Sequence, residues 1–162
     1  MDRRRFCLEL LGTSAVWQGL ARLGAAAPPL SEPATQKIRW NHNLKAAHKL
    51  AVEQDKPLLI VFGASWCTYC HKLERETLGD KRITAIVERD FIPVHLDYDR
   101  DSKIAKILEV ERLPCTVMLS PQADLLLKHE GYAEYKEYRQ TLQSALEKRA
   151  EIQQVQSTDS AR

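Results

Sequence analysis

Two cysteines separated by two residues are the clearest chemical feature of the chain. They stand in the segment Cys67-Thr68-Tyr69-Cys70. On a helix, residues three apart share a face, and their sulfur atoms come close enough to form a disulfide. Such a pair can cycle between dithiol and disulfide, because the Cys67 thiolate attacks a substrate disulfide and Cys70 then resolves the mixed disulfide. The spacing therefore predicts a redox pair.

The elements predicted around the pair are placed to activate Cys67. The run from Leu58 to Phe62 is apolar throughout, which is typical of a strand buried on both faces. Strong helix formers follow from Cys67 to about Leu78. A thiolate at the start of a helix is stabilised by unpaired backbone N–H groups and by the positive end of the helix dipole. Cys67 gains most from this position because it lies in the first turn.

Three other interpretations of the pair are less favoured. A zinc site needs four ligands, and the sequence has no second Cys/His cluster at a suitable spacing. A structural disulfide closing so short a loop gives little entropic stabilisation. His71 completes C-x-x-C-H, the attachment motif of a c-type haem, for which His71 and Met118 would be the axial ligands. A c-type cytochrome would be mainly helical, however, and strands are predicted on both sides of this motif, so we expect no metal and no cofactor.

The other predicted elements alternate between strands and helices. They are a short strand at Lys37–Trp40, helices at Asn43–Gln54, Asp80–Arg89, Ser102–Glu109 and Glu134–Arg149, and strands at Phe91–Asp97, Thr116–Leu119 and Leu125–His129. A parallel βαβ unit followed by an antiparallel hairpin makes a mixed sheet with helices on both faces. The sequence therefore predicts an α/β fold.

Charge is concentrated at the N-terminus. The chain of 162 residues has a net charge of +2, and residues 1–27 hold all of it. The rest of the chain has no basic surplus that would indicate a nucleic-acid partner.

Residues 1–27 have the pattern of an export signal. A basic start precedes a mostly apolar stretch from Phe6 to Ala21, and small residues follow at 24–27. Arg3-Arg4-Arg5-Phe6 resembles a twin-arginine signal. The stretch is too short and interrupted for a stable membrane span. An amphipathic N-terminal helix is the alternative, but we expect a signal and therefore a periplasmic or otherwise exported protein.

The remaining chain divides into three parts. Residues 28–36 are rich in proline and polar side chains, which is typical of a linker. Residues 37–149 contain all the predicted elements and form one domain. Residues 150–162 are expected to be a polar tail.

Two segments resemble the thioredoxin superfamily. KPLLIVFGASWCTYCHK at residues 56–72 is similar to its active-site strand and helix, and Leu113-Pro114-Cys115-Thr116 is similar to its cis-proline turn. The resemblance covers residues 37–149. The lead-in IRWNHNLKAAHKLAVEQDKPLLI, CHKLERETL and EGYAEYKEYRQTL resemble exported bacterial thioredoxin-like domains, including the C-terminal domain of the periplasmic disulfide-interchange reductase.

The resemblance implies a thioredoxin fold and a thiol–disulfide oxidoreductase. Cys67 would be the nucleophile and Cys70 the resolving thiol, with Trp66 as a flat wall beside them. Pro114 would be cis, and the backbone of Leu113 would pair with an extended substrate segment. We expect a monomer that exchanges disulfides with exported proteins and with a redox partner protein. Of the two directions, reduction of the substrate disulfide is favoured. The alternative is a non-catalytic peptide-binding or chaperone module.

Four positions depart from that family's pattern or adjoin its site. Val61 stands where thioredoxins carry a buried carboxylate, and His95 where a lysine is usual. His95 is either a substitute base or a partly exposed strand residue. His71 lies one turn after Cys67 and either tunes its thiolate or is simply exposed. Cys115 replaces a threonine and is expected near the pair, either as a third exchanging or oxidisable thiol or as a buried apolar residue.

Overall fold

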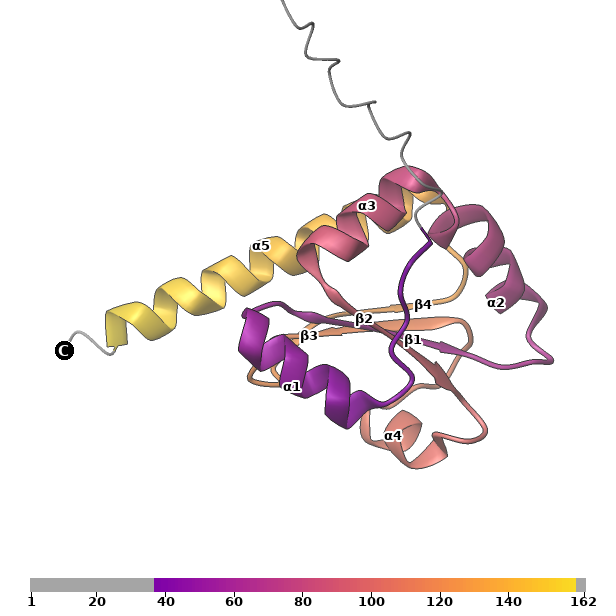
Figure 1. Ribbon diagram of the computed structural model, residues 1–162, viewed down its shortest axis with the longest axis horizontal. Helices are drawn as coiled ribbons and strands as arrows, with labels where there is room; N and C mark the ends of the chain where they lie inside the picture. Colours follow the sequence, from indigo (N-terminus) through magenta and orange to yellow (C-terminus); the bar gives the residue numbers. More distant parts are fainter. Residues whose placement is uncertain (1–36, 160–162) are drawn as a thin grey trace, which may run out of the picture. The chain divides into compact units, whose positions relative to one another are not determined.

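A mixed four-stranded sheet organises the domain. The computed structural model describes residues 37–159. Its strands lie in the order β2-β1-β3-β4 (Figure 1). Strands β1 and β2 are parallel, and β3 is antiparallel to both β1 and β4. The strands are β1 (Leu58–Gly63), β2 (Ile92–Asp97), β3 (Cys115–Leu119) and β4 (Leu125–Glu130). This confirms the predicted mixed sheet and hairpin.

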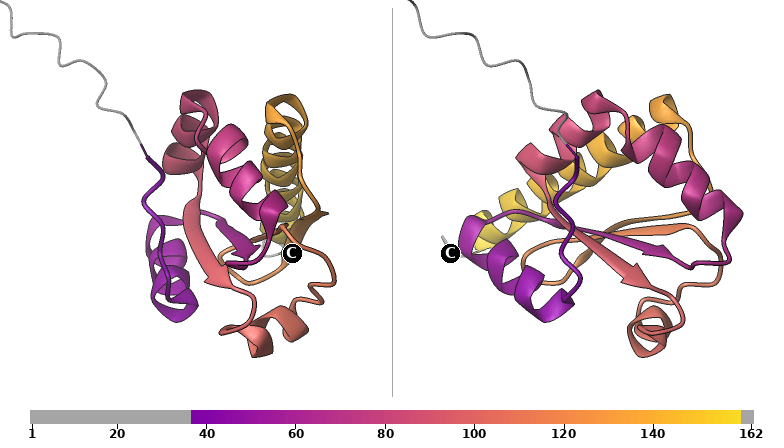
Figure 2. Two further views of the ribbon diagram at one scale, coloured as in Figure 1. Left: turned by 90° about the vertical axis from the view of Figure 1, so that its right-hand side faces the viewer. Right: turned by 45° about the vertical axis from the view of Figure 1, so that its right-hand side comes forward.

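Helices cover both faces of the sheet (Figure 2). They are α1 (Leu44–Gln54), α2 (Thr68–Lys72), the π-helix η1 (Leu73–Leu78), α3 (Lys81–Asp90), α4 (Ser102–Ile107) and α5 (Tyr135–Asp159). Helices α1 and α4 pack on one face, and η1, α3 and α5 on the other. We call the two apolar layers the α1/α4 core (including Ala47, Ala51, Phe62, Ala105 and Val117) and the α3/α5 core (including Leu59, Leu73, Ile83, Val87 and Tyr138).

Strand β1 is buried at all of its positions because it contributes to both cores. Leu58, Ile60 and Phe62 point into the α1/α4 core, whereas Leu59 and Val61 point into the α3/α5 core. Successive side chains of a strand face opposite sides, so a strand covered by helices on both sides needs an unbroken apolar run. The prediction of a central buried strand is confirmed.

Side-chain caps start two helices where the sequence predicted them. Asn43 Oδ1 accepts a hydrogen bond from the Ala46 N–H at 3.0 Å, and Asp80 Oδ1 accepts one from the Arg82 N–H at 2.8 Å. Each cap satisfies an N–H group that the first helical turn leaves unpaired.

One predicted strand does not form, and one predicted helix is longer than expected. Lys37–Trp40 is not a strand: only Asn41 bridges β2, at Val94, because the chain turns into the α1 cap two residues later. The last helix does not end at Arg149 but continues to Asp159, so part of the predicted tail is helical. Ile152 packs against the α3/α5 core and gives this extension an apolar contact.

The predicted signal and linker, residues 1–36, lie outside the described residues. Within residues 37–159, no helix combines the length and apolar character needed to cross a membrane.

Cys115 is a buried residue of the sheet. Its side chain is fully inaccessible and belongs to the α1/α4 core. Burial raises the pKa of the Cys115 thiol from 9.0 to about 12, and the Glu130 carboxylate on the neighbouring strand also raises it. The folded protein therefore holds this thiol in its neutral form.

Stability should fall at alkaline pH because of Cys115. Above pH 9 the unfolded chain releases the thiol proton, whereas the folded chain keeps it until about pH 12. The contribution of the Cys115 thiol to the free energy of unfolding is thus complete below pH 9. It decreases as pH rises further, by up to about 1.4 kcal/mol per pH unit for one group. Denaturant unfolding from pH 8 to 11 should show a shallower decline for Cys115→Ala than for the wild type. Equal slopes in the two proteins would contradict the assignment.

Candidate active site

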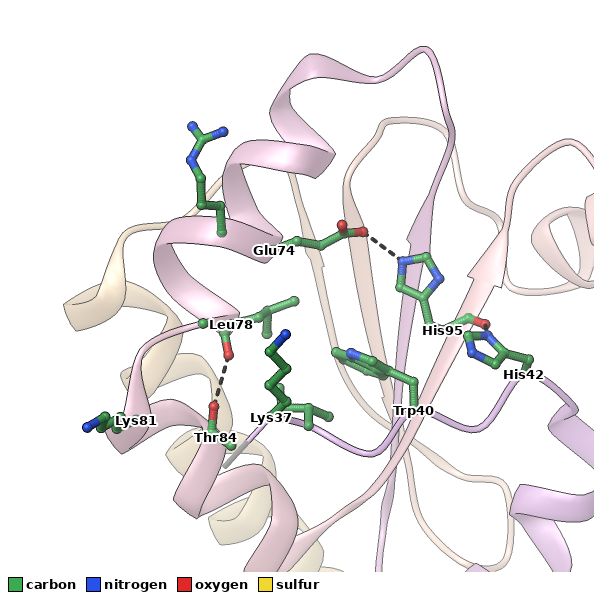
Figure 3. Close-up of a pocket in the computed structure, with 11 residues that line it drawn as sticks. Lys37, Trp40, His42, Glu74, Leu78, Lys81, Thr84 and His95 are labelled. Carbon is green, nitrogen blue, oxygen red and sulfur yellow. Dashed lines mark hydrogen bonds and ion pairs between the residues drawn. The ribbon is translucent and has the colours of Figure 1, made fainter. Parts of the chain in front are cut away.

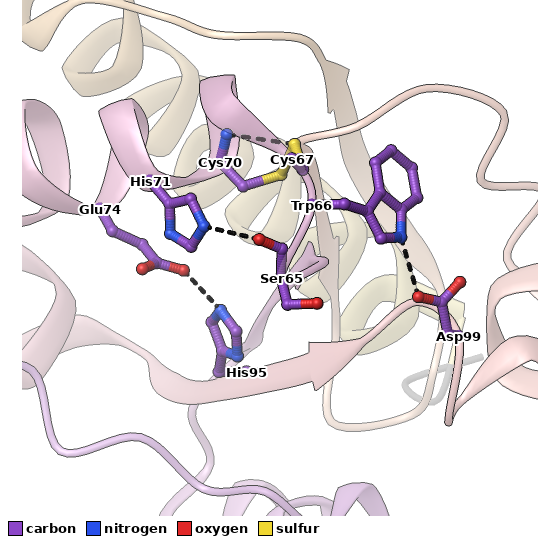
Figure 4. The surroundings of a disulfide bond; sticks show 8 residues. All are labelled: Ser65, Trp66, Cys67, Cys70, His71, Glu74, His95 and Asp99. Atoms are coloured by element: carbon purple, nitrogen blue, oxygen red, sulfur yellow. Dashed lines mark hydrogen bonds and ion pairs between the residues drawn. A yellow bond between two sulfur atoms is a disulfide. The ribbon is translucent and has the colours of Figure 1, made fainter.

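A disulfide joins Cys67 and Cys70 at the start of α2 (Figure 4). Their Cα atoms are 5.3 Å apart. Cys67 is the N-cap of α2, and its Sγ accepts a hydrogen bond from the Cys70 N–H at 3.2 Å. The predicted pair therefore forms at the junction of β1 and a helix, where an N–H group of the first helical turn is directed at the sulfur of Cys67.

The two cysteines differ in access. The residue Cys67 is 7% exposed and Cys70 is 2% exposed, so Cys67 lies nearer the surface. A turn with a 3.0 Å hydrogen bond from the Cys67 N–H to the Ala64 carbonyl brings the chain from β1 to this position. The difference in exposure fits Cys67 as the attacking thiol and Cys70 as the resolving one.

Aromatic side chains surround the outer side of the disulfide. Trp66 is 65% exposed and Tyr69 is 62% exposed. The Trp66 indole N–H donates to Asp99 Oδ2 at 2.9 Å, which fixes the ring beside Cys67. These rings, with Cys67, Thr68, Tyr98, Glu111 and Leu113, line a hollow at the disulfide.

The turn before β3 lies against the pair. The Leu113–Pro114 peptide bond is cis. Leu113 and Tyr98 both pack on the small cluster formed by Ala64, Cys67 and Cys70. The structure thus brings Leu113 to the disulfide, next to the predicted Trp66.

Sequence reasoning missed Tyr69, Tyr98 and Glu111 as lining residues. A usable signal existed for Tyr98, because it directly follows the strand that is parallel to β1. The carboxyl ends of parallel neighbours meet at one edge of the sheet, and the cysteine pair follows β1 at that same edge.

The other predicted modulators occupy different places. His71 Nε2 is 3.0 Å from the Ser65 carbonyl oxygen, so the ring is directed at the preceding loop (Figure 4). Cys115 packs in the α1/α4 core, whereas the disulfide packs with Ala64. Tyr98 and Leu113 pack on both groups, and full burial of Cys115 agrees with the expected alternative of a buried apolar residue.

His95 lies within hydrogen-bonding distance of Glu74 on the inner side of the motif. Its Nε2 is 2.9 Å from Glu74 Oε1, and the His95 side chain is 24% exposed. The Trp40 ring packs edge-on against the His95 imidazole, with 5.6 Å between the two ring centroids. These residues line a second hollow together with His42 and Lys37 (Figure 3). Glu74 was not predicted, although it follows Cys70 by four residues and so shares its helical face.

Residues 37–159 contain no group of three or more His, Cys, Asp or Glu side chains arranged to hold a metal ion. Met118, considered above as an iron ligand, is fully buried in the α3/α5 core.

Curated relatives match a part of the chain. Spermatogenesis-associated protein 20 of Homo sapiens is 26% identical over 81 residues, which cover 50% of this chain and 10% of that protein. An uncharacterized protein of Caenorhabditis elegans is 26% identical over 87 residues, covering 53% of this chain and 12% of that protein. The chain spans about a tenth of the length of the curated relatives it matches.

Solved structures share the fold. A DsbH oxidoreductase superposes with a TM-score of 0.63 at 16% identity, over 76% of this chain and 96% of that one. A thioredoxin from Thermus thermophilus gives 0.63 at 21% identity, over 68% and 88% of the two chains. The DsbD C-terminal domain of Neisseria meningitidis gives 0.56 at 18% identity, over 63% and 93%. A family model described as a thioredoxin-like domain matches residues 44–146. Since that match covers well over half of the sequence, the chain belongs to the family of thioredoxin-like domains.

Proposed function

We propose that the protein is a thiol–disulfide oxidoreductase that reduces disulfides of exported proteins. The observation that carries this proposal is the Cys67–Cys70 disulfide at a helix start, beside a hollow lined by exposed aromatic rings. The thioredoxin-like fold and the bonded pair support the oxidoreductase class. Export is inferred from the sequence of residues 1–27, and the reductive direction from the surroundings of Cys67.

Two exchange steps account for the reaction. In the dithiol form, the Cys67 thiolate attacks one sulfur of a substrate disulfide and releases the other as a thiolate. Cys70, as its thiolate, then attacks the Cys67 sulfur and releases the substrate as a dithiol. The substrate disulfide is then reduced, and the Cys67–Cys70 pair is oxidised to a disulfide. A redox partner protein with a free dithiol must reduce this disulfide before the next cycle.

The surroundings of Cys67 favour reduction over oxidation. Strong oxidants of this chemistry stabilise their reduced, thiolate form. Here Thr68 and Tyr69 between the cysteines carry no positive charge, and His71 is directed at the Ser65 carbonyl. The Cys67 sulfur therefore receives the Cys70 N–H, and the two residues between the cysteines add no positive charge, which leaves the disulfide form comparatively favourable.

Substrate would lie across the aromatic hollow. Trp66 and Tyr98 offer flat apolar surfaces, and Leu113 provides backbone next to Cys67. An extended segment paired with the Leu113 backbone would place its disulfide over Cys67, the more exposed residue of the pair. We propose that the protein acts as a monomer, because one chain contains both cysteines and the whole hollow.

Replacing the resolving thiol should trap substrates. In Cys70→Ser the mixed disulfide on Cys67 cannot be resolved, so disulfide-linked complexes should accumulate and be visible on non-reducing gels. Cys67→Ser is the matched control and should trap none. If Cys70→Ser also traps nothing, the alternative of a peptide-binding module replaces the enzyme.

The reduction potential tests the direction. Equilibration of the pair against glutathione should give a potential below about −200 mV, in the range of reducing members of this chemistry and not near the about −120 mV of a strong oxidant. Cys115→Ser should leave the value unchanged, because that thiol lies in a separate core. A potential close to the oxidising value would reverse the proposed direction.

A further inference from the structure

We propose that Glu111 and Asp99 select substrates that carry a basic side chain beside the reacting cysteine. This inference rests on the proposed function, because it names the substrate class of the same hollow. Of the described residues that line the hollow at the disulfide, Glu111 alone is charged. A substrate segment that approaches Cys67 there is therefore exposed to a negative charge and to no lining cation.

The Glu111 carboxylate is available to a partner. The residue is exposed, and within residues 37–159 its carboxylate has no ion pair or hydrogen bond; its backbone N–H donates to Glu130 Oε1 at 3.5 Å. Lys128 on the same strand as Glu130 is bonded elsewhere, because its Nζ donates to the Glu109 carbonyl at 2.7 Å and lies 3.7 Å from Glu130 Oε1. Arg112 is exposed and does not line the hollow.

Asp99 places a second carboxylate at the edge of the Trp66 ring. Its Oδ2 accepts the indole N–H at 2.9 Å (Figure 4). A neutral donor leaves the negative charge of a carboxylate in place, and no ion pair involves Asp99 in the described part of the chain. The adjacent Arg100 lies 3.8 Å from Asp97 Oδ1 instead. A cation above the indole would therefore lie close to an unpaired carboxylate.

The aromatic rings of the hollow favour the same charge. A Lys or Arg cation is attracted to the face of an aromatic ring, and most strongly to that of tryptophan. Trp66, Tyr69 and Tyr98 all line the hollow. A guanidinium can stack on a ring and donate hydrogen bonds to a carboxylate at once. A substrate carboxylate at the same place would be repelled by Glu111, so the hollow discriminates by charge in both directions.

The basic residue would be a near neighbour of the substrate cysteine. Leu113, whose backbone is proposed to pair with the substrate, follows Glu111 by two residues, and both line the hollow with Cys67. Two residues of extended chain span about 7 Å. We therefore expect the basic side chain one or two positions from the cysteine that Cys67 attacks.

Three peptides that differ at one position test the charge selection. Each has a single cysteine, blocked as a mixed disulfide with thionitrobenzoate, next to arginine, glutamine or glutamate. Attack by the reduced protein releases the coloured thiolate, and division by the rate with dithiothreitol corrects for the intrinsic reactivity of each peptide. At low ionic strength, the corrected rate for arginine should exceed that for glutamate by about tenfold. The ratio should fall towards one in about 1 M salt, where exposed charges are screened.

Two isosteric variants and a matched control identify the groups responsible. Glu111→Gln should lower the arginine-to-glutamate ratio to about threefold, and Glu111→Gln combined with Asp99→Asn should lower it to about one. Asparagine keeps an oxygen that can accept the indole N–H. Glu53→Gln should keep the wild-type ratio, because Glu53 is an exposed residue near the end of α1, which leads to the opposite end of β1.

The outcomes separate this inference from the function beneath it. A wild type that releases no thionitrobenzoate from any peptide overturns both. A wild type that reacts with all three peptides at equal corrected rates overturns the charge selection alone. A double variant that keeps the tenfold ratio has the same consequence, since the preference then does not come from Glu111 and Asp99.

Discussion

Burial of β1 between two apolar layers is the constraint on which the rest of the structure depends. A strand covered on both faces must be apolar at every position, and its backbone groups must all pair with neighbouring strands. The strand is thereby fixed in place and direction, and the turn at its carboxyl end is fixed with it. Cys67 and Cys70 follow that turn directly, so the cysteine pair is attached to a strand that is buried on both faces.

Different side chains lie on the two sides of one short helix at this edge. Exposed aromatic rings and the turn at Leu113 surround the outer sulfur, whereas Glu74 and His95 lie behind the inner one. The segment between them changes from α-helix to π-helix after Lys72, and such local changes often occur at functional sites. One helical segment therefore begins at Cys67, beside the aromatic hollow, and carries the carboxylate that faces His95 from the other side.

Much of the fold was predictable because its signals are local. The apolar run of β1, the caps at Asn43 and Asp80, and the turn between β3 and β4 each lie within a few residues of the element that they specify. The extent of α5 was not predictable, because its later turns depend on Ile152 reaching a core built by distant residues. The strand expected at Lys37–Trp40 does not form, because only the next residue, Asn41, bridges β2.

The sequence by itself determined the redox pair, since two cysteines three positions apart on a helix start meet without help from the rest of the chain. It also determined the central strand and the α/β class. Tertiary structure alone decided which other groups reach that pair. Cys115 lies in the α1/α4 core, and His71 is directed at the Ser65 carbonyl. His95 bonds Glu74, which is 21 positions away in the sequence. The physical reason is that a side chain's neighbours beyond one helical turn are set by sheet register and helix packing, and these depend on contacts between residues far apart in the chain.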